Sequence, residues 1–253
     1  MKENKIREYF DEMSIERDLK LRNPILKYEQ DTRQKAVIEM LIPTKGELIL
    51  DVGCGNGRDI IIFANNSAFC VGIDFSSGMI KEGKKAIDTM GFRNVHLISG
   101  GATNLPFSDG TFDKISCSEV IEHIPDWEKA IAEMNRVLKI GGKLVITTPN
   151  WYSLYGFTRK LFDLFSFILR KKSVPSHPYD EWKTQKEVIN VLKKHGIEID
   201  RTIGICFIPG HLTYSLPKGS KEMVVKLSSY IEKMLKNKLT GKGYMIGISA
   251  IKK

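Results

Sequence analysis

The chain has 253 residues, 42% of them hydrophobic and 27% charged, and its 39 Lys and Arg residues against 30 Asp and Glu residues give a net charge of +9. This composition excludes disordered, collagen-like and disulfide-scaffold proteins, and because no run of about 18 uninterrupted apolar residues occurs, it also excludes a transmembrane span. Four scattered cysteines without CxxC spacing, and an N-terminus without an apolar signal segment, lead us to expect reduced thiols and a cytoplasmic protein.

The first 44 residues are expected to form a helical cap, with helices over 3–18 and 28–42. From residue 45 onward, strands alternate with helices. Strands are expected over 46–52, 69–75, 94–99, 112–118 and 141–149, and helices over 58–66, 77–90 and 126–139. Alternation at this spacing predicts βαβ units and a parallel sheet.

Residues 151–183 interrupt this alternation and are expected to form a helical lid insertion. Its first part, 151–172, places seven aromatic residues between basic ends, which is too apolar for a solvated loop. We expect a helical flap packed on the sheet, a lid over a hydrophobic acceptor, or a helix at a membrane interface. The C-terminal part, 184–253, is predicted to contain a helix over 184–195, a strand over 196–208, a Lys-rich amphipathic helix over 219–237 and a last strand over 243–251.

The excess positive charge lies outside the first 150 residues, which carry a balance of −2. Residues 151–172 contribute +4, and the segment 218–253 contributes +7 from nine Lys against two Glu. A basic surface of this kind attracts anionic partners such as phosphorylated substrates, nucleic acid or acidic lipid. The alternative is an ordinary solvated Lys-rich surface, since no RNA-binding signature accompanies the lysines.

A glycine-rich turn directly after the first predicted strand is the most informative feature. Gly53, Gly55 and Gly57 follow Asp51 there, and glycine lets the backbone adopt positive φ and approach a ligand closely. A dinucleotide-binding turn would need a small residue at position 58, where this chain has Arg58, and Asp51 would bring negative charge to a pyrophosphate. S-adenosylmethionine is cationic and has no phosphate, so it fits an acidic turn better.

A second acidic residue, Asp74, ends the second predicted strand 21 residues beyond Gly53. A doubly wound fold places a carboxylate at this point against ribose hydroxyls, whose two protons the carboxylate oxygens can accept. The alternative is the N-cap of the following helix, a role that Ser76 or Ser77 would also fill.

Four segments in order and spacing carry a family resemblance: ILDVGCGNGRD, VGIDFS, GGATNLPFSDGTFDKISCSEVIEHIPD and LKIGGKLVITTPN. They resemble the successive motifs of class I S-adenosylmethionine-dependent methyltransferases, in particular the small-molecule branch typified by ubiquinone and menaquinone biosynthesis enzymes. The resemblance implies one domain over 1–253, with a helical cap (1–44), a cofactor-binding core (45–150), the lid insertion after strand 5 (151–183) and the remainder of the sheet (184–253). The implied fold is α/β, a doubly wound, Rossmann-like, seven-stranded, mostly parallel sheet with an antiparallel last strand.

The same resemblance assigns the cofactor site. It places the glycine loop with Cys54 around the cofactor, Asp51 near the methionine end, Asp74 on the ribose and Arg33 on the methionine carboxylate. It also implies adenine and pocket contacts from Phe75, Gly101, Ala102, Thr103 and Ser118. The family usually has Asp in place of Gly101, where the carboxylate accepts from the adenine amino group, so recognition here is left to backbone groups, Thr103 or Asn104.

Glu119, Glu122 and His123 form a cluster just past the fourth predicted strand. They resemble the metal-binding stretch of small-RNA 3′-terminal 2′-O-methyltransferases and of some quinone O-methyltransferases, with His177 as a further ligand. We favour the alternative without metal, in which the cluster shapes the pocket wall. His123 is then the candidate general base, because its unperturbed pKa lies near neutrality. By position alone, Tyr179 and Trp182 are expected to line the acceptor site.

The sequence therefore predicts methyl transfer from S-adenosylmethionine to an oxygen or carbon atom of a small acceptor, lipophilic or anionic. Two alternatives are a metal-assisted RNA 2′-O-methyltransferase, which would use the basic tail, and a non-catalytic S-adenosylmethionine-binding protein. The expected partner is the small-molecule acceptor. Nucleic acid is a less favoured partner, and the segment 151–172 is a candidate for peripheral membrane contact.

Overall fold

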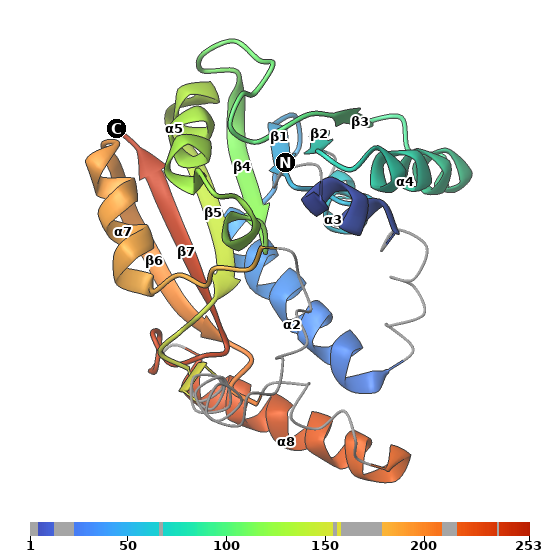
Figure 1. Ribbon diagram of the computed structural model, residues 1–253, viewed down its shortest axis with the longest axis vertical. Coiled ribbons are helices and arrows are strands. Elements are labelled where there is room, and N and C mark those ends of the chain that lie inside the picture. The colour runs from blue at the N-terminus through green and yellow to red at the C-terminus, as the bar shows by residue number, and fades with distance from the viewer. Residues whose placement is uncertain are drawn as a thin grey trace.

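A seven-stranded sheet forms the centre of the computed structural model, which describes residues 5–12, 23–65, 68–153, 156–157, 179–208, 217–236 and 238–253 (Figure 1). The strand order is β3-β2-β1-β4-β5-β7-β6. The strands are β1 (Leu48–Val52), β2 (Phe69–Asp74), β3 (Val95–Ser99), β4 (Phe112–Ser118), β5 (Leu138–Pro149), β6 (Ile197–Ile205) and β7 (Met245–Lys252). Strands β1 to β5 pair in parallel, and β7 is antiparallel to both of its neighbours. The predicted fold class and the antiparallel last strand are confirmed.

Helices cover both faces of the sheet, as a doubly wound fold requires. One buried cluster joins the sheet to α2 (Pro24–Leu41), α3 (Arg58–Ala64) and α4 (Ser77–Met90). The other joins it to η1 (Ile121–His123), α5 (Trp127–Val137) and α7 (Gln185–Lys194). α8 (Lys218–Leu235) packs against α2. Because strand side chains alternate between the two faces, Leu50 and Val52 enter one cluster and Ile49 enters the other.

Local capping explains where several helices begin and end. The Ser76 side chain accepts from Met79 N–H at 3.1 Å at the start of α4, and Gly91 ends the helix at φ +76°. α2 begins four residues before the predicted start at residue 28, because the side chain of Asn23 caps it and Pro24 occupies its first turn. Residues 5–12 are helical, within the helix predicted over 3–18.

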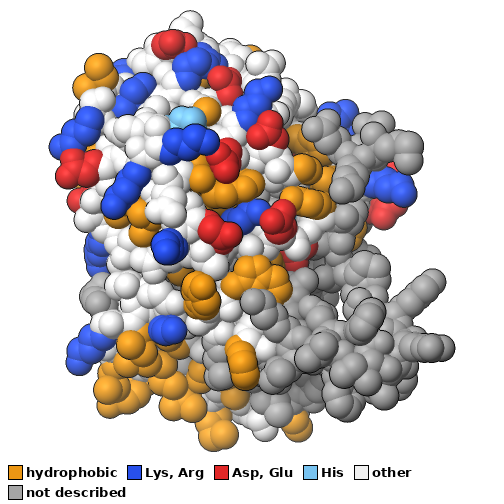
Figure 2. Space-filling view, turned by 60° about the vertical axis from the view of Figure 1, so that its left-hand side comes forward, with side chains coloured by type: hydrophobic (Ala, Val, Ile, Leu, Met, Phe, Trp, Pro, Cys, Tyr) orange, Lys and Arg blue, Asp and Glu red, His pale blue; other side chains and the backbone are white. Residues whose placement is uncertain are grey.

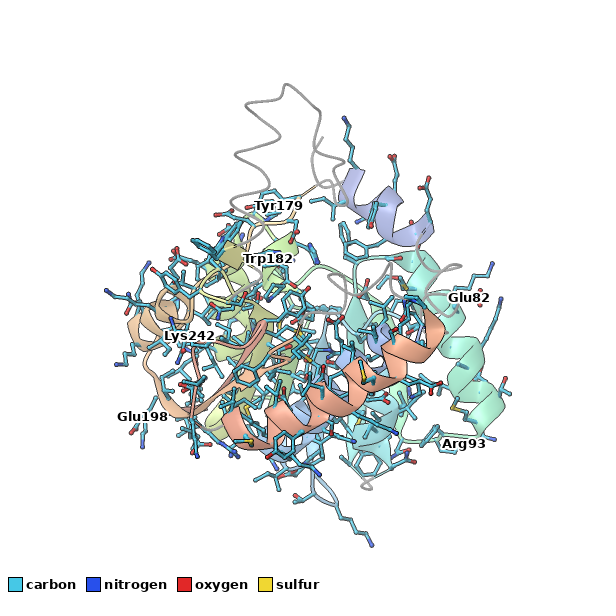
Figure 3. All side chains as sticks on the ribbon, turned by 90° about the horizontal axis from the view of Figure 1, so that it is seen from below. Glu82, Arg93, Tyr179, Trp182, Glu198 and Lys242 are labelled. Carbon is cyan, nitrogen blue, oxygen red and sulfur yellow. The ribbon has the colours of Figure 1, made fainter. Side chains whose placement is uncertain are left out.

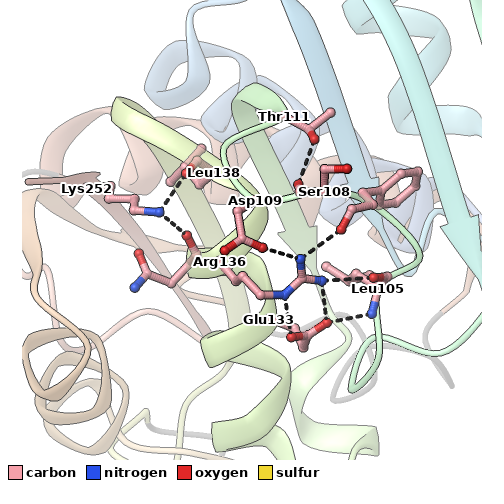
Figure 4. A network of polar contacts seen from close by, with 10 residues as sticks. Leu105, Ser108, Asp109, Thr111, Glu133, Arg136, Leu138 and Lys252 are labelled. Atoms are coloured by element: carbon pink, nitrogen blue, oxygen red, sulfur yellow. Dashed lines mark hydrogen bonds and ion pairs between the residues drawn. The ribbon is translucent and has the colours of Figure 1, made fainter.

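Arg136 of α5 fixes the loop that connects β3 to β4 (Figure 4). Its guanidinium donates to the carbonyls of Leu105 and Phe107 and pairs with Asp109 and Glu133, all at 2.8 to 2.9 Å. At the same end of α5, Lys252 Nζ donates to the carbonyl oxygens of Asn135 in the last turn and of the C-cap Leu138. The bonds of Arg136 hold the loop that follows β3, and the first residues of this loop line the cavity of the candidate active site.

Most of the predicted lid insertion lies outside the described residues. At its start, Trp151 packs on Trp182 with ring centroids 5.4 Å apart, while Tyr152 and Phe157 are exposed. Among the helices of the described ranges, none combines the length and the apolar character needed to cross a bilayer.

Candidate active site

A cavity of about 560 Å³ lies at the carboxyl ends of β1, β2 and β4. The strand order reverses between β1 and β4, and open α/β sheets bind ligands beside such a switch point. Ten of the thirteen residues predicted to bind cofactor or act in catalysis line this cavity: Arg33, Gly53, Gly55, Asp74, Phe75, Gly101, Ala102, Thr103, Ser118 and His123.

The glycine turn approaches the cavity with its backbone. Gly53, Gly55 and Gly57 have φ of +71°, +55° and +81°, a region that residues with a Cβ rarely adopt. A Cβ on Gly53 would stand 2.2 Å from Val120 Cγ2, so only glycine fits there. The turn is held by Asp74, whose Oδ2 accepts from Gly55 N–H at 2.8 Å.

Asp74 ends β2 at the cavity wall. Its Oδ1 accepts from Ser76 N–H at 2.8 Å, so the two oxygens tie the glycine turn to the start of α4. The alternative that Asp74 caps α4 is wrong, because the cap is the Ser76 hydroxyl. Contact of Asp74 with a ribose stays a prediction, which its place on the wall allows.

Three residues predicted to bind cofactor, Asp51, Cys54 and Gly57, lie outside the cavity lining. Asp51 points to the face opposite Leu50, beside Ser116 of β4, and burial raises the pKa of its carboxyl well above its ordinary value. The Cys54 thiol faces its own turn, 3.6 Å from the Gly55 carbonyl. Gly57 is the N-cap of α3. These three residues therefore support the glycine turn from the side away from the cavity. Which side they face depends on the alternation of side chains along β1 and on the packing of the loop.

Arg33 reaches the cavity wall with its charge already balanced. Its Nη1 lies 2.5 Å and its Nη2 3.2 Å from the two carboxylate oxygens of Asp59, which also accepts from Gln34 at 2.7 Å. Both partners of this ion pair are nearly buried. The pairing leaves Arg33 less free to bind a ligand carboxylate than the sequence suggested.

Two carboxyl groups stand beside the cavity with raised pKa values. Glu119 lines the cavity in a left-handed conformation at φ +57°, and its Oε1 is solvent-inaccessible with no hydrogen-bond partner in the described ranges. Glu122 is buried and accepts from Thr148 Oγ1 at 3.0 Å. Burial raises the pKa of each carboxyl to about 8, and for Glu119 the nearby Glu122 carboxyl adds to the effect.

The imidazole of His123 is held in one orientation. Its Nδ1 lies 3.1 Å from the Tyr179 carbonyl oxygen, and because a carbonyl only accepts, Nδ1 carries the proton and Nε2 is the unprotonated ring nitrogen. The ring of Phe10 packs edge-on against it with centroids 5.4 Å apart. Burial lowers the pKa of His123 below its ordinary value, so the ring is neutral at pH 7.

The proposed metal cluster does not assemble as a ligand set. No group of three His, Cys, Asp or Glu side chains within the described ranges is arranged to hold a metal ion. Glu122 is engaged by Thr148, and its Oε1 is 3.8 Å from His123 Nε2. The further candidate, His177, lies outside the described residues.

The helix at 5–12 closes the cavity with contacts that sequence reasoning did not find. Arg7 lies over the Phe75 ring at 4.9 Å, and Asp11 accepts from Ser76 Oγ at 2.5 Å and from Gly78 N–H at 3.0 Å. Further lining residues that the sequence did not single out are Ile6, Leu26, Glu29, Gln30, Ile124, Tyr244 and Met245. For Ile6, Leu26, Glu29 and Gln30, the only signal in the sequence was the amphipathic pattern of the predicted helical cap.

Tyr179 and Trp182, labelled in Figure 3, are not among the residues that line the cavity. The Trp182 ring packs on Tyr244, which does line the cavity, with centroids 5.8 Å apart, and its Nε1 donates to Asp180. Tyr179 contributes its backbone carbonyl to His123. Both residues therefore support lining groups.

Three comparisons with known proteins each match most of this chain to methyltransferases. The profile of the family described as "Methyltransferase domain" matches residues 43–241. Demethylmenaquinone methyltransferase of Bacillus cereus (strain AH187) is 27% identical over 212 residues, which are 78% of this chain and 89% of that protein. A possible histamine N-methyltransferase of Thermotoga maritima has a TM-score of 0.67 at 19% identity, over 97% of this chain and 99% of its own. Geranyl diphosphate C-methyltransferase of Streptomyces coelicolor A3(2) has a TM-score of 0.64 at 16% identity, over 88% and 79%.

Proposed function

The chain belongs to the methyltransferase domain family and is a class I S-adenosylmethionine-dependent methyltransferase, and from this premise we propose that its acceptor is a small lipophilic molecule. The observation that carries the proposal is the composition of the cavity wall. Apolar side chains reach this wall from the N-terminal helices, from the residue after η1 and from the start of β7: Ile6, Phe10, Leu26, Ile124 and Met245. Apolar walls with a few polar groups are typical of sites for lipophilic ligands.

The cofactor end of the cavity fits a cationic nucleoside. Asp74 and Glu119 bring carboxyl groups to the wall, and one oxygen of Glu119 has no partner within the described ranges. Gly101 leaves open space, since a Cβ there would meet no atom within 4 Å. When bound, S-adenosylmethionine supplies an electrophilic methyl group on a sulfonium ion. The residues of this chain then bind and orient the reactants and exclude water.

The charges on the wall favour a lipophilic acceptor over an anionic one. Arg33 is neutralised by Asp59, and Glu29 and Asp74 add acidic groups, while the Glu119 carboxyl keeps its proton at neutral pH. Arg7 is the one remaining Lys or Arg side chain among the described lining residues, and it stacks on Phe75. A second anion in this space would meet more negative than positive groups, whereas an uncharged acceptor would not.

His123 is the residue placed to take a proton from the acceptor, because Glu119 keeps its own proton at neutral pH. His123 presents a neutral imidazole whose Nε2 is the ring atom that can accept a proton. A hydroxyl or an acidic C–H group at this wall would find an acceptor for its proton as the methyl group is transferred. The name of one relative, demethylmenaquinone methyltransferase, agrees with a quinol-like acceptor.

The test is a transfer assay with isotopically labelled S-adenosylmethionine and fractionated metabolites. We expect label in an organic-solvent extract after incubation with a lipid fraction, and none with a water-soluble anionic fraction. Asp74→Asn should reduce cofactor binding, and His123→Ala should reduce the rate with cofactor binding retained. Label incorporated only into phosphorylated water-soluble compounds or RNA would contradict the proposed acceptor class.

A further inference from the structure

The outer face of α8 carries a row of four large apolar side chains, which we call the α8 stripe: Met223, Leu227, Tyr230 and Met234. They are spaced by four, three and four residues, so they lie above one another on one side of the helix. Each is between 49% and 68% exposed. A continuous apolar row of this kind is unusual on a surface that only meets water.

Polar contacts on the inner face of α8 hold the stripe outward. Ser228 and Glu232 are buried, and Glu232 Oε2 accepts from Cys206 N–H at 3.0 Å. Lys236, just after the helix, forms an ion pair of 2.5 Å with Glu39 of α2. Turning the stripe toward the protein would break these contacts and leave buried polar groups without partners. The exposure of the stripe is therefore fixed by the fold.

The surroundings of the stripe are positively charged. Lys226 and Lys233 lie along one side of it, and Lys238 follows the helix; all three are exposed and form no ion pair with a described residue. The residues from the start of α8 to the loop before β7, 218–242, have seven Lys against two Glu, and one of these, Glu232, is buried. An apolar row beside lysines is the pattern of helices that lie in a membrane interface.

The position of α8 leaves this face free to meet a flat surface. In Figure 1, α8 lies along the lower end of the molecule, and Figure 3, a view from below, shows it crossing the front of the ribbon. In Figure 2, hydrophobic side chains gather at the same lower end, with Lys or Arg side chains above them.

We propose that the α8 stripe docks on the surface of an anionic lipid bilayer. The stripe would enter the boundary between headgroups and acyl chains, and Lys226 and Lys233 would meet the lipid charges. A second copy of the chain fits less well, because pairing through α8 would bring together two segments, 218–242, of charge +5 each. RNA would use the lysines but leave the apolar row in water. The inference does not depend on the identity of the acceptor.

Vesicle flotation of the full chain without cofactor or acceptor tests the proposal. We expect the chain to float with vesicles of phosphatidylcholine and phosphatidylglycerol (3:1) and to remain below vesicles of phosphatidylcholine alone. The double variant Leu227→Glu/Met234→Glu should lower the partition coefficient at least about 30-fold. Lys226→Ala/Lys233→Ala should lower it roughly 25-fold at low salt, since each lysine near a charged membrane contributes about fivefold.

The matched control is Ile140→Glu, which places the same charge on an exposed apolar residue of β5. It should bind vesicles like the unmodified chain, and thermal unfolding should show that all variants are folded. The proposal would be overturned if Ile140→Glu lost as much vesicle binding as Leu227→Glu/Met234→Glu, or if the unmodified chain did not bind anionic vesicles. So would a dimer in sedimentation that Leu227→Glu/Met234→Glu dissociates, because the stripe would then be covered by a second copy. Vesicle binding with an unrelated acceptor would leave the proposal standing and refute only the proposed function.

Discussion

Replacing Gly101 by Asp should tighten cofactor binding, because the structure has room for the carboxylate that the family usually carries there. Gly101 follows β3, lines the cavity and is exposed. A Cβ built on it would meet nothing within 4 Å, and its φ lies outside the left-handed region. Gly101→Asp therefore introduces neither a steric clash nor backbone strain.

The size of the effect follows from one charged hydrogen bond and its costs. A hydrogen bond to a charged group contributes about 1.5–3 kcal/mol to the free energy of binding. Part of this is lost because the exposed carboxylate must give up water and because Asp74 lies on the same wall. We expect a net gain of about 1 kcal/mol, which is roughly a fivefold lower Kd. The free energy of unfolding should change little.

Isothermal titration with two product analogues separates this hydrogen bond from a general electrostatic gain. S-adenosylhomocysteine carries the adenine amino group, and S-inosylhomocysteine lacks it. Gly101→Asp should tighten binding of the first and not of the second, and Gly101→Ala should bind both like the unmodified chain. An equal gain for both ligands, or no gain for either in a folded variant, would refute the reasoning about this position.

Three further changes test the turn, the ion pair and the buried carboxyls. Gly53→Ala should lower the free energy of unfolding by about 2–3 kcal/mol in urea titration, since the new Cβ meets Val120 at a positive φ, and Gly53→Ala/Val120→Ala should recover part of the loss. Arg33→Leu should lower the free energy of unfolding by about 3–5 kcal/mol, because it leaves Asp59 without its ion-pair partner. The double variant Arg33→Leu/Asp59→Leu should lose less stability, and an equal loss in both variants would contradict this account. The pKa of Glu119 is raised to about 8 in the folded chain, so folding takes up a proton and stability falls as pH rises from about 4.5 to 8. As the pH rises from 5.5 to 8, the free energy of unfolding of Glu119→Gln should therefore increase by on the order of 2 kcal/mol relative to that of the unmodified chain. A difference in free energy of unfolding that stays constant across this range would contradict the raised pKa.

Local patterns predicted the elements of the sheet because they depend on short stretches of sequence. The run at 112–118 and the helix at 77–90 agree residue for residue with β4 and α4. In α4, Ser76 and Gly91 mark both ends by capping alone. The strand at 141–149 is longer than predicted, because Leu138 also pairs with Phe112 of β4, a contact between strands that no local pattern contains.

Site residues were predictable where the backbone makes the site and less so where side-chain direction decides. The glycine turn could be read from its spacing, because positive φ is a local requirement. Asp51, predicted near the methionine end of the cofactor, lies outside the cavity lining, because the direction of its side chain depends on how β1 is turned in the sheet. The contact of Asp11 with Ser76 joins residues 65 positions apart, and only the packing of the cap on α4 brings them together.

The way this site accommodates negative charge explains why it suits a cationic nucleoside and not a dinucleotide. In a dinucleotide site, the positive end of the helix after the glycine turn meets a pyrophosphate. Here the first turn of α3 already contains Asp59, a carboxylate held by Arg33. Glu119 and Glu122 keep their protons at neutral pH because burial raises their pKa values. The wall can thus be rich in carboxyl groups without strong repulsion, and a ligand that brings positive charge lowers those pKa values, while one that brings phosphate would raise them further.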